Sequence, residues 1–266
     1  MPLARFALLL PLILLSVAIP GAGQGQLTKD PMAVTVLAQM AAATDWNALN
    51  VPRDAVAGGS ITRYQGSTTA PVGFTLKVKA CREYRSDVQE ITGTRSTIVN
   101  GDSAAVLFSN DTRFVPPHSA ISMKPVALPF FCDLATFSDA NVSLHYVGTE
   151  TVAGQLGHRV DMSREPSRSD PLAAPRRRAS RMTVWISTTT ALPVQIASIR
   201  VANDSPTATA TTIRVFSDYR LVNGIAVPFH QEEYSGGQLL YTLQLNSLSF
   251  NVGLSDADFT VPTPLQ

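Results

Sequence analysis

This chain of 266 residues contains few cysteines and histidines, and its net charge is close to zero. It contains two cysteines and four histidines, and its 21 Lys and Arg nearly balance its 20 Asp and Glu. A formal net charge of +1 creates no long-range field that would attract nucleic acid or an anionic membrane. We therefore expect no nucleic-acid partner.

The residues that carry catalysis or bind metals in other proteins are scattered here. The chain has no Gly-x-Ser-x-Gly or Ser-x-x-Lys sequence to hold a nucleophilic serine. Glu232 and Glu233 are adjacent, but neighbours in a strand point to opposite faces, so we interpret both as residues of a solvent-exposed edge. The histidines occur singly, without the four-residue spacing of a helical metal site, at His118, His145, His158 and His230. We predict no catalytic residue, no metal ion and no cofactor, and so no enzyme.

Only the N-terminus contains a long apolar run. Arg5 precedes apolar residues 6–19, and Pro20 and small residues follow them. The run is shorter than the roughly 20 residues that a membrane-spanning helix needs, and its flanks are typical of a secretory signal. We predict a signal peptide over residues 1–23 and a mature protein that is periplasmic or secreted. No cysteine follows the run, so we expect neither a lipid anchor nor an integral membrane protein.

Export to an oxidising compartment permits a disulfide bond between Cys81 and Cys132. Two buried thiols are the alternative, because the sequence does not fix whether the two Cβ atoms can meet. A bridge that closes a loop of this length would add roughly 4 kcal/mol of stability by the chain-entropy argument. The sequence leaves both alternatives open.

The residues after the signal predict a helix. Asp30 suits the N-cap and Pro31 the first helical position. Apolar residues then recur at helical spacing, at Ala33, Val36, Leu37 and Met40. This apolar stripe must cover another part of the protein.

From Ile61 onward, short runs alternate apolar and polar residues, which indicates antiparallel strands with one solvated face. Phe74, Leu76 and Val78 share the apolar face of one such strand. A change of phase in the last strand predicts a bulge near Asn246. Three dipeptides that tolerate the positive φ of tight hairpins separate the strands: Asn100-Gly101, Asn223-Gly224 and Gly236-Gly237.

Two stretches interrupt the strands of what we interpret as one domain over residues 24–266. Residues 123–137 combine prolines with phenylalanines, and we expect a short helical insertion on the sheet. Residues 164–181 carry six Arg against two acids and no apolar period, so we predict a flexible basic loop at 164–180. The arginines at 176–178 would suit an anionic lipid headgroup or a partner's acidic patch; a solvated loop is the simpler interpretation.

The last third of the chain resembles a known superfamily. Residues 182–196, MTVWISTTTALPVQI, join a Trp-containing strand to a turn and a Leu-Pro pair, and residues 216–259 follow as further hairpins. This pattern is similar to the closing strands of the LolA-like superfamily of periplasmic lipoprotein carriers. That superfamily includes the outer-membrane lipoprotein carrier, a lipid-transfer lipoprotein of mycobacteria and a sensor of envelope stress. The resemblance implies an incomplete β-barrel whose concave face is covered by helices, between which an acyl chain can enter.

We therefore expect a mainly β protein with some helix: a curved antiparallel sheet, or half-barrel, covered by the N-terminal helix and short helical insertions. Its expected function is to bind or carry a lipid or the acyl chain of a lipoprotein in the cell envelope. The alternative is a structural or regulatory envelope protein that acts through protein contacts, with these side chains as ordinary core. The expected ligand-binding residues are Phe74, Leu76, Val78, Phe130, Phe131 and Phe137.

Overall fold

The computed structural model describes residues 27–46, 51–64, 70–80, 82–125, 127–128 and 136–263. The described helices are α1 (Pro31–Thr44), α2 (Pro117–Ala120), α3 (Ala173–Ala179) and the short 3-10 helix η1 (Asp256–Phe259). A first set of strands comprises β1 (Asp54–Arg63), β2 (Val72–Lys79), β3 (Glu83–Glu90), β4 (Gly93–Asn100), β5 (Ser103–Phe108) and β6 (Asp111–Val115). A second set comprises β7 (Val142–Val152), β8 (Gln155–Arg164), β9 (Met182–Ser187), β10 (Pro193–Val201), β11 (Thr209–Val222), β12 (Ile225–Ser235) and β13 (Gln238–Phe250).

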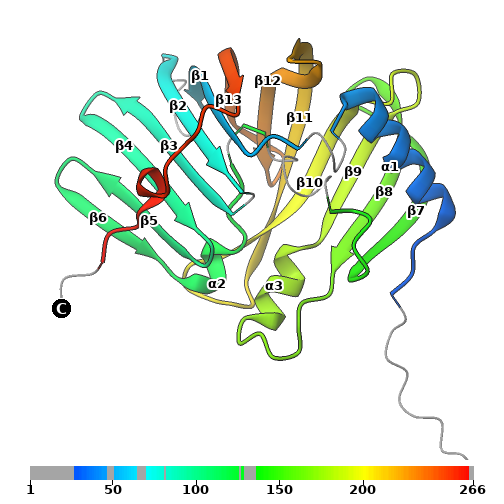
Figure 1. The fold of residues 1–266 in the computed structure, drawn as a ribbon, viewed down its shortest axis with the longest axis horizontal. Coiled ribbons are helices and arrows are strands. Elements are labelled where there is room, and N and C mark those ends of the chain that lie inside the picture. Colours follow the sequence, from blue (N-terminus) through cyan, green and yellow to red (C-terminus); the bar gives the residue numbers. More distant parts are fainter. Residues whose placement is uncertain are drawn as a thin grey trace, which may run out of the picture.

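All 13 strands of the described residues belong to one sheet (Figure 1). Each set is a meander in which strands that follow one another in the chain pair antiparallel. Antiparallel pairing of β1 with β13 joins the two meanders and leaves β6 and β7 at the two edges. The sheet is therefore open, and the predicted fold class, a mainly antiparallel half-barrel with few helices, is confirmed.

Helix α1 forms where the sequence predicts it. An oxygen of the Asp30 carboxylate accepts a hydrogen bond from the Met32 N–H at 2.9 Å, and Pro31 occupies the first turn. The Asp30 N–H in turn donates to the Leu144 carbonyl at 3.0 Å, which ties the start of the helix to β7. The apolar stripe of α1 is buried against the second meander, as expected, at Ala33, Val36, Leu37 and Met40.

Two of the three predicted turns and the bulge match the sequence prediction; at the third, Asn100 pairs with Ser103, so Gly101 and Asp102 form the turn. Asn223 and Gly224 both have positive φ, as do Gly236 and Gly237, and each pair forms a two-residue hairpin connection. The register of β1 against β13 shifts by one residue so that Asn246 has no partner. The predicted bulge near Asn246 is thus confirmed.

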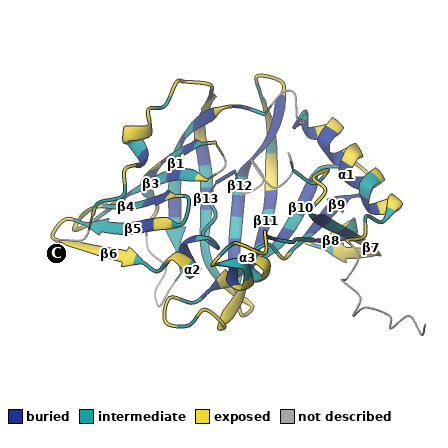
Figure 2. Ribbon diagram, turned by 60° about the horizontal axis from the view of Figure 1, so that its bottom comes forward, coloured by how far each residue is buried: buried dark blue, intermediate teal, exposed yellow. Residues whose placement is uncertain are grey.

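The interior is divided into two apolar clusters, which we call the first core and the second core. Both are visible in Figure 2 as buried positions along the strands, whereas β6 and the outer side of α1 are exposed. The first core joins Trp46, Ala120, Ala127 and Leu128 to residues of β1–β5, β12 and β13. The second core joins α1 to residues of β7–β11.

The polar face of β2 is less solvated than its alternating pattern predicts. Lys77 and Lys79 form ion pairs with Asp258 and Asp256 of η1, and Phe259 of η1 is fully buried. The alternation itself is confirmed, since Thr75 is exposed and Lys77 and Lys79 are partly exposed. Alternation along one strand could not show that the distant C-terminal segment lies over part of this face.

Several sequence predictions concern residues outside the described ranges. They are the signal peptide at 1–23, the pairing of Cys81 with Cys132, and the ligand-binding roles of Phe130 and Phe131. Most of the expected helical insertion at 123–137 falls there as well. None of the described helices is both long and apolar enough to span a bilayer.

Candidate functional site

A cleft of about 410 Å³ lies where the two cores meet, beside α2 and α3. Its apolar walls come from both sides. The first core contributes Tyr84, Val99 and Leu128, and the second contributes Val142 and Met162, with Met182 packed against it. The volume is within the roughly 300–1,000 Å³ typical of small-molecule sites. The cleft is therefore an apolar space of ligand size between two packed regions.

Charged side chains line the cleft together with these apolar residues. Four cations line the cleft, Arg82, Lys124, Arg164 and Arg176, together with two carboxylates, Asp102 and Asp139. The lining of the cleft thus combines apolar walls with a set of charged side chains, which we call its border.

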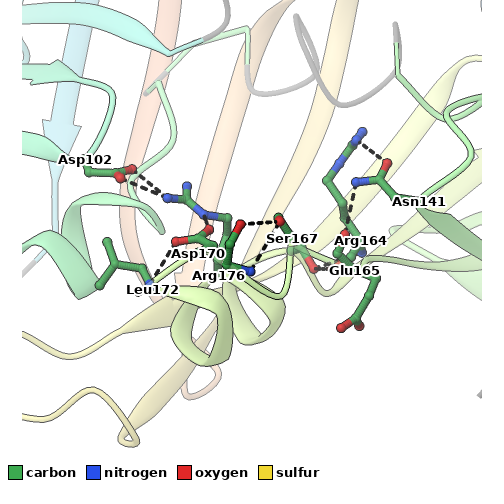
Figure 3. A network of polar contacts seen from close by, with 10 residues as sticks. Asp102, Asn141, Arg164, Glu165, Ser167, Asp170, Leu172 and Arg176 are labelled. Atoms are coloured by element: carbon green, nitrogen blue, oxygen red, sulfur yellow. Dashed lines mark hydrogen bonds and ion pairs between the residues drawn. The ribbon is translucent and has the colours of Figure 1, made fainter. Parts of the chain in front are cut away.

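Arg176 bridges the two meanders at this border. Its Nη2 lies 3.0 and 2.9 Å from the two carboxylate oxygens of Asp102, which follows β4, while its Nε donates to Asp170 at 2.6 Å (Figure 3). Burial alone lowers the pKa of Arg176, but hydrogen bonds and charge from these two carboxylates raise it above its ordinary value. Arg176 is therefore held as a cation in a fixed place.

The neighbouring Arg164, at the end of β8, is also held in place. Its Nη1 donates to the Asn141 side chain at 2.8 Å and lies 2.9 Å from Asp139. Figure 3 shows Arg164 and Arg176 on the same basic segment. Two of the four cations are thus oriented by side chains on other parts of the chain.

The basic segment at 164–180 has more regular structure than the sequence predicts. It contains α3, and Arg177 forms an ion pair with Glu165 inside the segment. A backbone N–H from Leu172 and the charge of Arg176 hold the pKa of Asp170 below its usual value. Local ion pairs contribute to this conformation, and a search for periodic apolar residues in the sequence does not detect them. The flexibility of the segment in solution stays a prediction.

The structure divides the sequence-predicted ligand residues between the two cores. Phe74, Leu76 and Val78 lie in the first core with at most 4% of each residue exposed, and none of them lines the cleft. Val78 is directly opposite Tyr84, a wall residue, so this row lies one strand behind the cleft. Phe137 packs against the second core beside Thr136, which does line the cleft.

A buried polar cluster beneath the cleft was missed. Arg214 of β11 donates to Glu233 of β12 at 2.6 Å, and the Tyr241 hydroxyl of β13 donates to the same carboxylate oxygen at 2.7 Å. Arg214 Nη1 also donates to the Pro125 carbonyl at 2.6 Å, which fixes a segment that lines the cleft. The interpretation of Glu233 as a solvent-edge residue was wrong: its side chain is 3% exposed.

The charge states of this cluster follow from burial and pairing. Burial raises the pKa of Tyr84 to about 12, although Arg200 and Arg214 oppose the rise. Burial also favours a neutral Glu233, but the charges of Arg214 and Arg200 outweigh it and leave the pKa of Glu233 below its ordinary value. Glu233 and Arg214 are therefore a buried ion pair at neutral pH.

Three of the four histidines make hydrogen bonds with other parts of the chain. Ring nitrogens of His118, His158 and His230 lie 3.0–3.2 Å from the Ala202 carbonyl, the Tyr146 hydroxyl and the Gln244 amide oxygen. Within the described ranges, no group of three or more His, Cys, Asp or Glu is arranged to hold a metal ion.

Neither a protein-family model nor a curated protein sequence matches this chain. Its backbone is similar to solved bacterial structures. They include a LolA superfamily protein of Nitrosomonas europaea (TM-score 0.53, 10% identity, 86% of this chain and 97% of that one) and a DUF1329 family protein of Desulfovibrio piger (0.54, 14%, 86% and 97%). A domain named for outer-membrane lipoprotein sorting, from Vibrio parahaemolyticus, matches similarly (0.54, 11%, 86% and 96%). The chain thus has the fold of the LolA superfamily, which confirms the resemblance noted in its sequence.

Proposed function

We propose that the protein binds an apolar ligand, the acyl chain of a lipid or of an acylated protein, in the cleft between its two cores. It would do so in the cell envelope after export, and without catalysis. The observation that carries this proposal is the cleft of about 410 Å³ with apolar walls from both cores.

The lining of the cleft, more than its size, favours a binding protein over a scaffold. Two other surface clefts are as large, at about 420 and 560 Å³. The cleft at the meeting of the two cores has apolar walls from both of them, which an acyl chain could cover. A solved domain of the same fold that is named for outer-membrane lipoprotein sorting supports the same interpretation.

The proposal assigns different roles to the predicted residues. Phe74, Leu76 and Val78 form a second layer behind the cleft wall and set its shape. Phe137 supports the opposite wall, and Phe130 and Phe131 remain candidate contacts with the ligand. Substituting Leu76, which is fully buried, with Trp should therefore destabilise the fold by about 1–3 kcal/mol through overpacking.

Met123→Trp tests the cleft directly. Met123 lines the cleft on the segment after α2 and is only partly buried, so an indole there should fill the space with little strain. Met32→Trp on the exposed side of α1 is the matched control. In titrations of delipidated protein with a fluorescent fatty acid, we expect Met123→Trp to weaken binding at least tenfold and Met32→Trp to leave it unchanged.

Mass spectrometry of lipid that co-purifies with the exported protein is the independent check. Absence of co-purified lipid together with no saturable binding of fatty-acid or phospholipid probes would contradict the proposal. The structural or regulatory alternative would then stand.

A further inference from the structure

We infer that the cleft selects ligands with one acyl chain and an anionic head group, and that Arg82 and Arg176 bind the head group. This inference rests on the proposed function. It names the class of amphiphile that the cleft takes, using the charges at its border.

Arg82 is the cation at the border that has an unused guanidinium. Arg82 is exposed, and within the described residues its charge acts on Asp170 but its guanidinium forms no hydrogen bond or close ion pair. Its carbonyl accepts a hydrogen bond from the Gly101 N–H at 3.0 Å, which places Arg82 beside the turn that carries Asp102. Asp102 also binds Arg176, so Arg82 and Arg176 lie on the same side of the cleft, next to Asp102.

More cations than carboxylates line the cleft. Four cations and two carboxylates line the cleft, and Asp170 adds a third carboxylate behind Arg176. Arg82 acts on Asp170 only through its charge, so its N–H donors remain available. An anionic head group would accept hydrogen bonds from these donors, whereas an uncharged ester would gain much less from them.

Guanidinium groups suit this role. Arg presents N–H donors in a planar fork that matches a carboxylate or a phosphate, and charge-assisted hydrogen bonds gain strength where water is partly excluded. Arg176 is already oriented by Asp102 and Asp170, so little side-chain entropy is lost when it binds an anion.

The volume of the cleft points to a single chain. About 410 Å³ is close to the lower end of the range for ligand sites, and lipids with two or three acyl chains need considerably more room. The apolar walls receive the chain and the cations at the border receive the head group.

The experiment compares a dansyl-labelled undecanoic acid with its methyl ester, which has the same chain and no charge. Both are titrated into the delipidated full-length mature protein and into Arg82→Gln, Arg82→Lys and Arg113→Gln. Arg113, exposed on the edge strand β6 and remote from the cleft lining, is the control. Thermal unfolding confirms that each variant is folded.

We expect the native protein to bind the acid about tenfold more tightly than the ester. Arg82→Gln should weaken binding of the acid about three- to tenfold and leave the ester unchanged. Arg82→Lys should keep most of the preference, and Arg113→Gln all of it.

Equal affinity of the native protein for acid and ester would overturn the head-group site while leaving the cleft as an acyl-chain site. So would an equal loss for both probes in Arg82→Gln. If neither probe binds saturably, the proposed function fails and the head-group site fails with it.

Discussion

The two cores of the sheet are equally well buried but differently covered. Over the second core lies α1, a regular helix of 14 residues whose apolar stripe comes from one short stretch of sequence. Over the first core lie side chains from separate places, among them Trp46, Ala120 and Leu128. The cleft lies where the two cores meet, and Ala120 and Leu128 of this irregular cover line it together with Val142 and Met162 of the second core. We interpret the irregular cover as the side from which the proposed ligand enters.

A seam of buried polar side chains separates the two cores. On one side of this seam, Arg214 lies on β11 two residues from Phe216 of the second core. On the other side, Glu233 contacts Tyr241 of β13, two residues from Leu243 of the first core. Buried ionic groups fix an arrangement more than they stabilise it, and their removal one at a time is severe. We interpret this seam as what keeps the two cores apart and the cleft between them open.

The largest expected effect comes from breaking the seam. Glu233→Ala leaves the Arg214 charge buried without its carboxylate, so we expect a loss of about 3–5 kcal/mol in the free energy of unfolding. Glu232→Ala, on the neighbouring residue whose side chain is 33% exposed, should cost less than about 1 kcal/mol. Urea unfolding of both variants measures the difference; equal losses would contradict a buried pair.

The pH dependence of Glu233→Gln checks the same pair. The pKa of Glu233 is below its ordinary value of 4.5, so the unfolded chain takes up a proton at a higher pH than the native protein. The stability from this carboxylate is complete above about pH 4.5 and is lost as the pH falls through the native pKa. The native protein should thus exceed Glu233→Gln in stability at neutral pH, and the gap should narrow in acid.

Helix α1 gives the next largest effect. Leu37 is fully buried in the second core, so Leu37→Ala should destabilise the protein by about 2–5 kcal/mol. Leu27→Ala, at an exposed position before the helix, should have little effect. Because α1 is the cover of the second core, we expect hydrogen exchange of its own amides to rise most. A uniform rise over the whole sheet would show that the two cores unfold as one.

The features that the sequence predicted are the local ones. The cap and stripe of α1, the Asn223-Gly224 hairpin and the bulge at Asn246 each depend on a few neighbouring residues. The pairing of Arg214 with Glu233 was also accessible, because counting back from the two-residue turn sets them opposite one another. The burial of these two side chains could not be predicted from the sequence, since it depends on which segments cover the sheet.

The cleft could not be predicted from the sequence for the same reason. Its walls combine residues that are far apart in the sequence, so no periodic pattern along the chain connects them. They are Tyr84, Val99 and Leu128 on one side and Val142, Met162 and Met182 on the other. Sequence alternation found the apolar row of Phe74, Leu76 and Val78 but could not show that it lies one strand behind the wall. The basic segment was recognised by composition, while its ion pair to Asp102 depends on a turn 74 residues away.

A smaller effect of the opposite sign is expected at Gln231 in the seam. This side chain is 1% exposed, and neither its amide nitrogen nor its oxygen has a hydrogen-bond partner in the described part of the chain. A buried polar group without a partner costs about 1–3 kcal/mol, and Met has a similar volume and no such requirement. Gln231→Met should therefore stabilise the protein by about 1 kcal/mol in urea unfolding. A clear loss of stability would show that the amide is satisfied in solution, for example by water.

The smallest effect on stability is expected at the bridge between the meanders, Asp102 with Arg176. Both side chains are partly exposed, so Asp102→Asn should cost at most about 1 kcal/mol. Its effect on motion should be larger, because this contact ties α3 to the turn after β4 across the border of the cleft. Amides of residues 173–180 should exchange faster in Asp102→Asn, while those of β1 and β13 keep their native rates. Asp111→Asn, in an ion pair on the edge strand β6, is the matched control. If α3 is equally protected in both variants, the basic segment is held by its own contacts and the border of the cleft does not depend on the bridge.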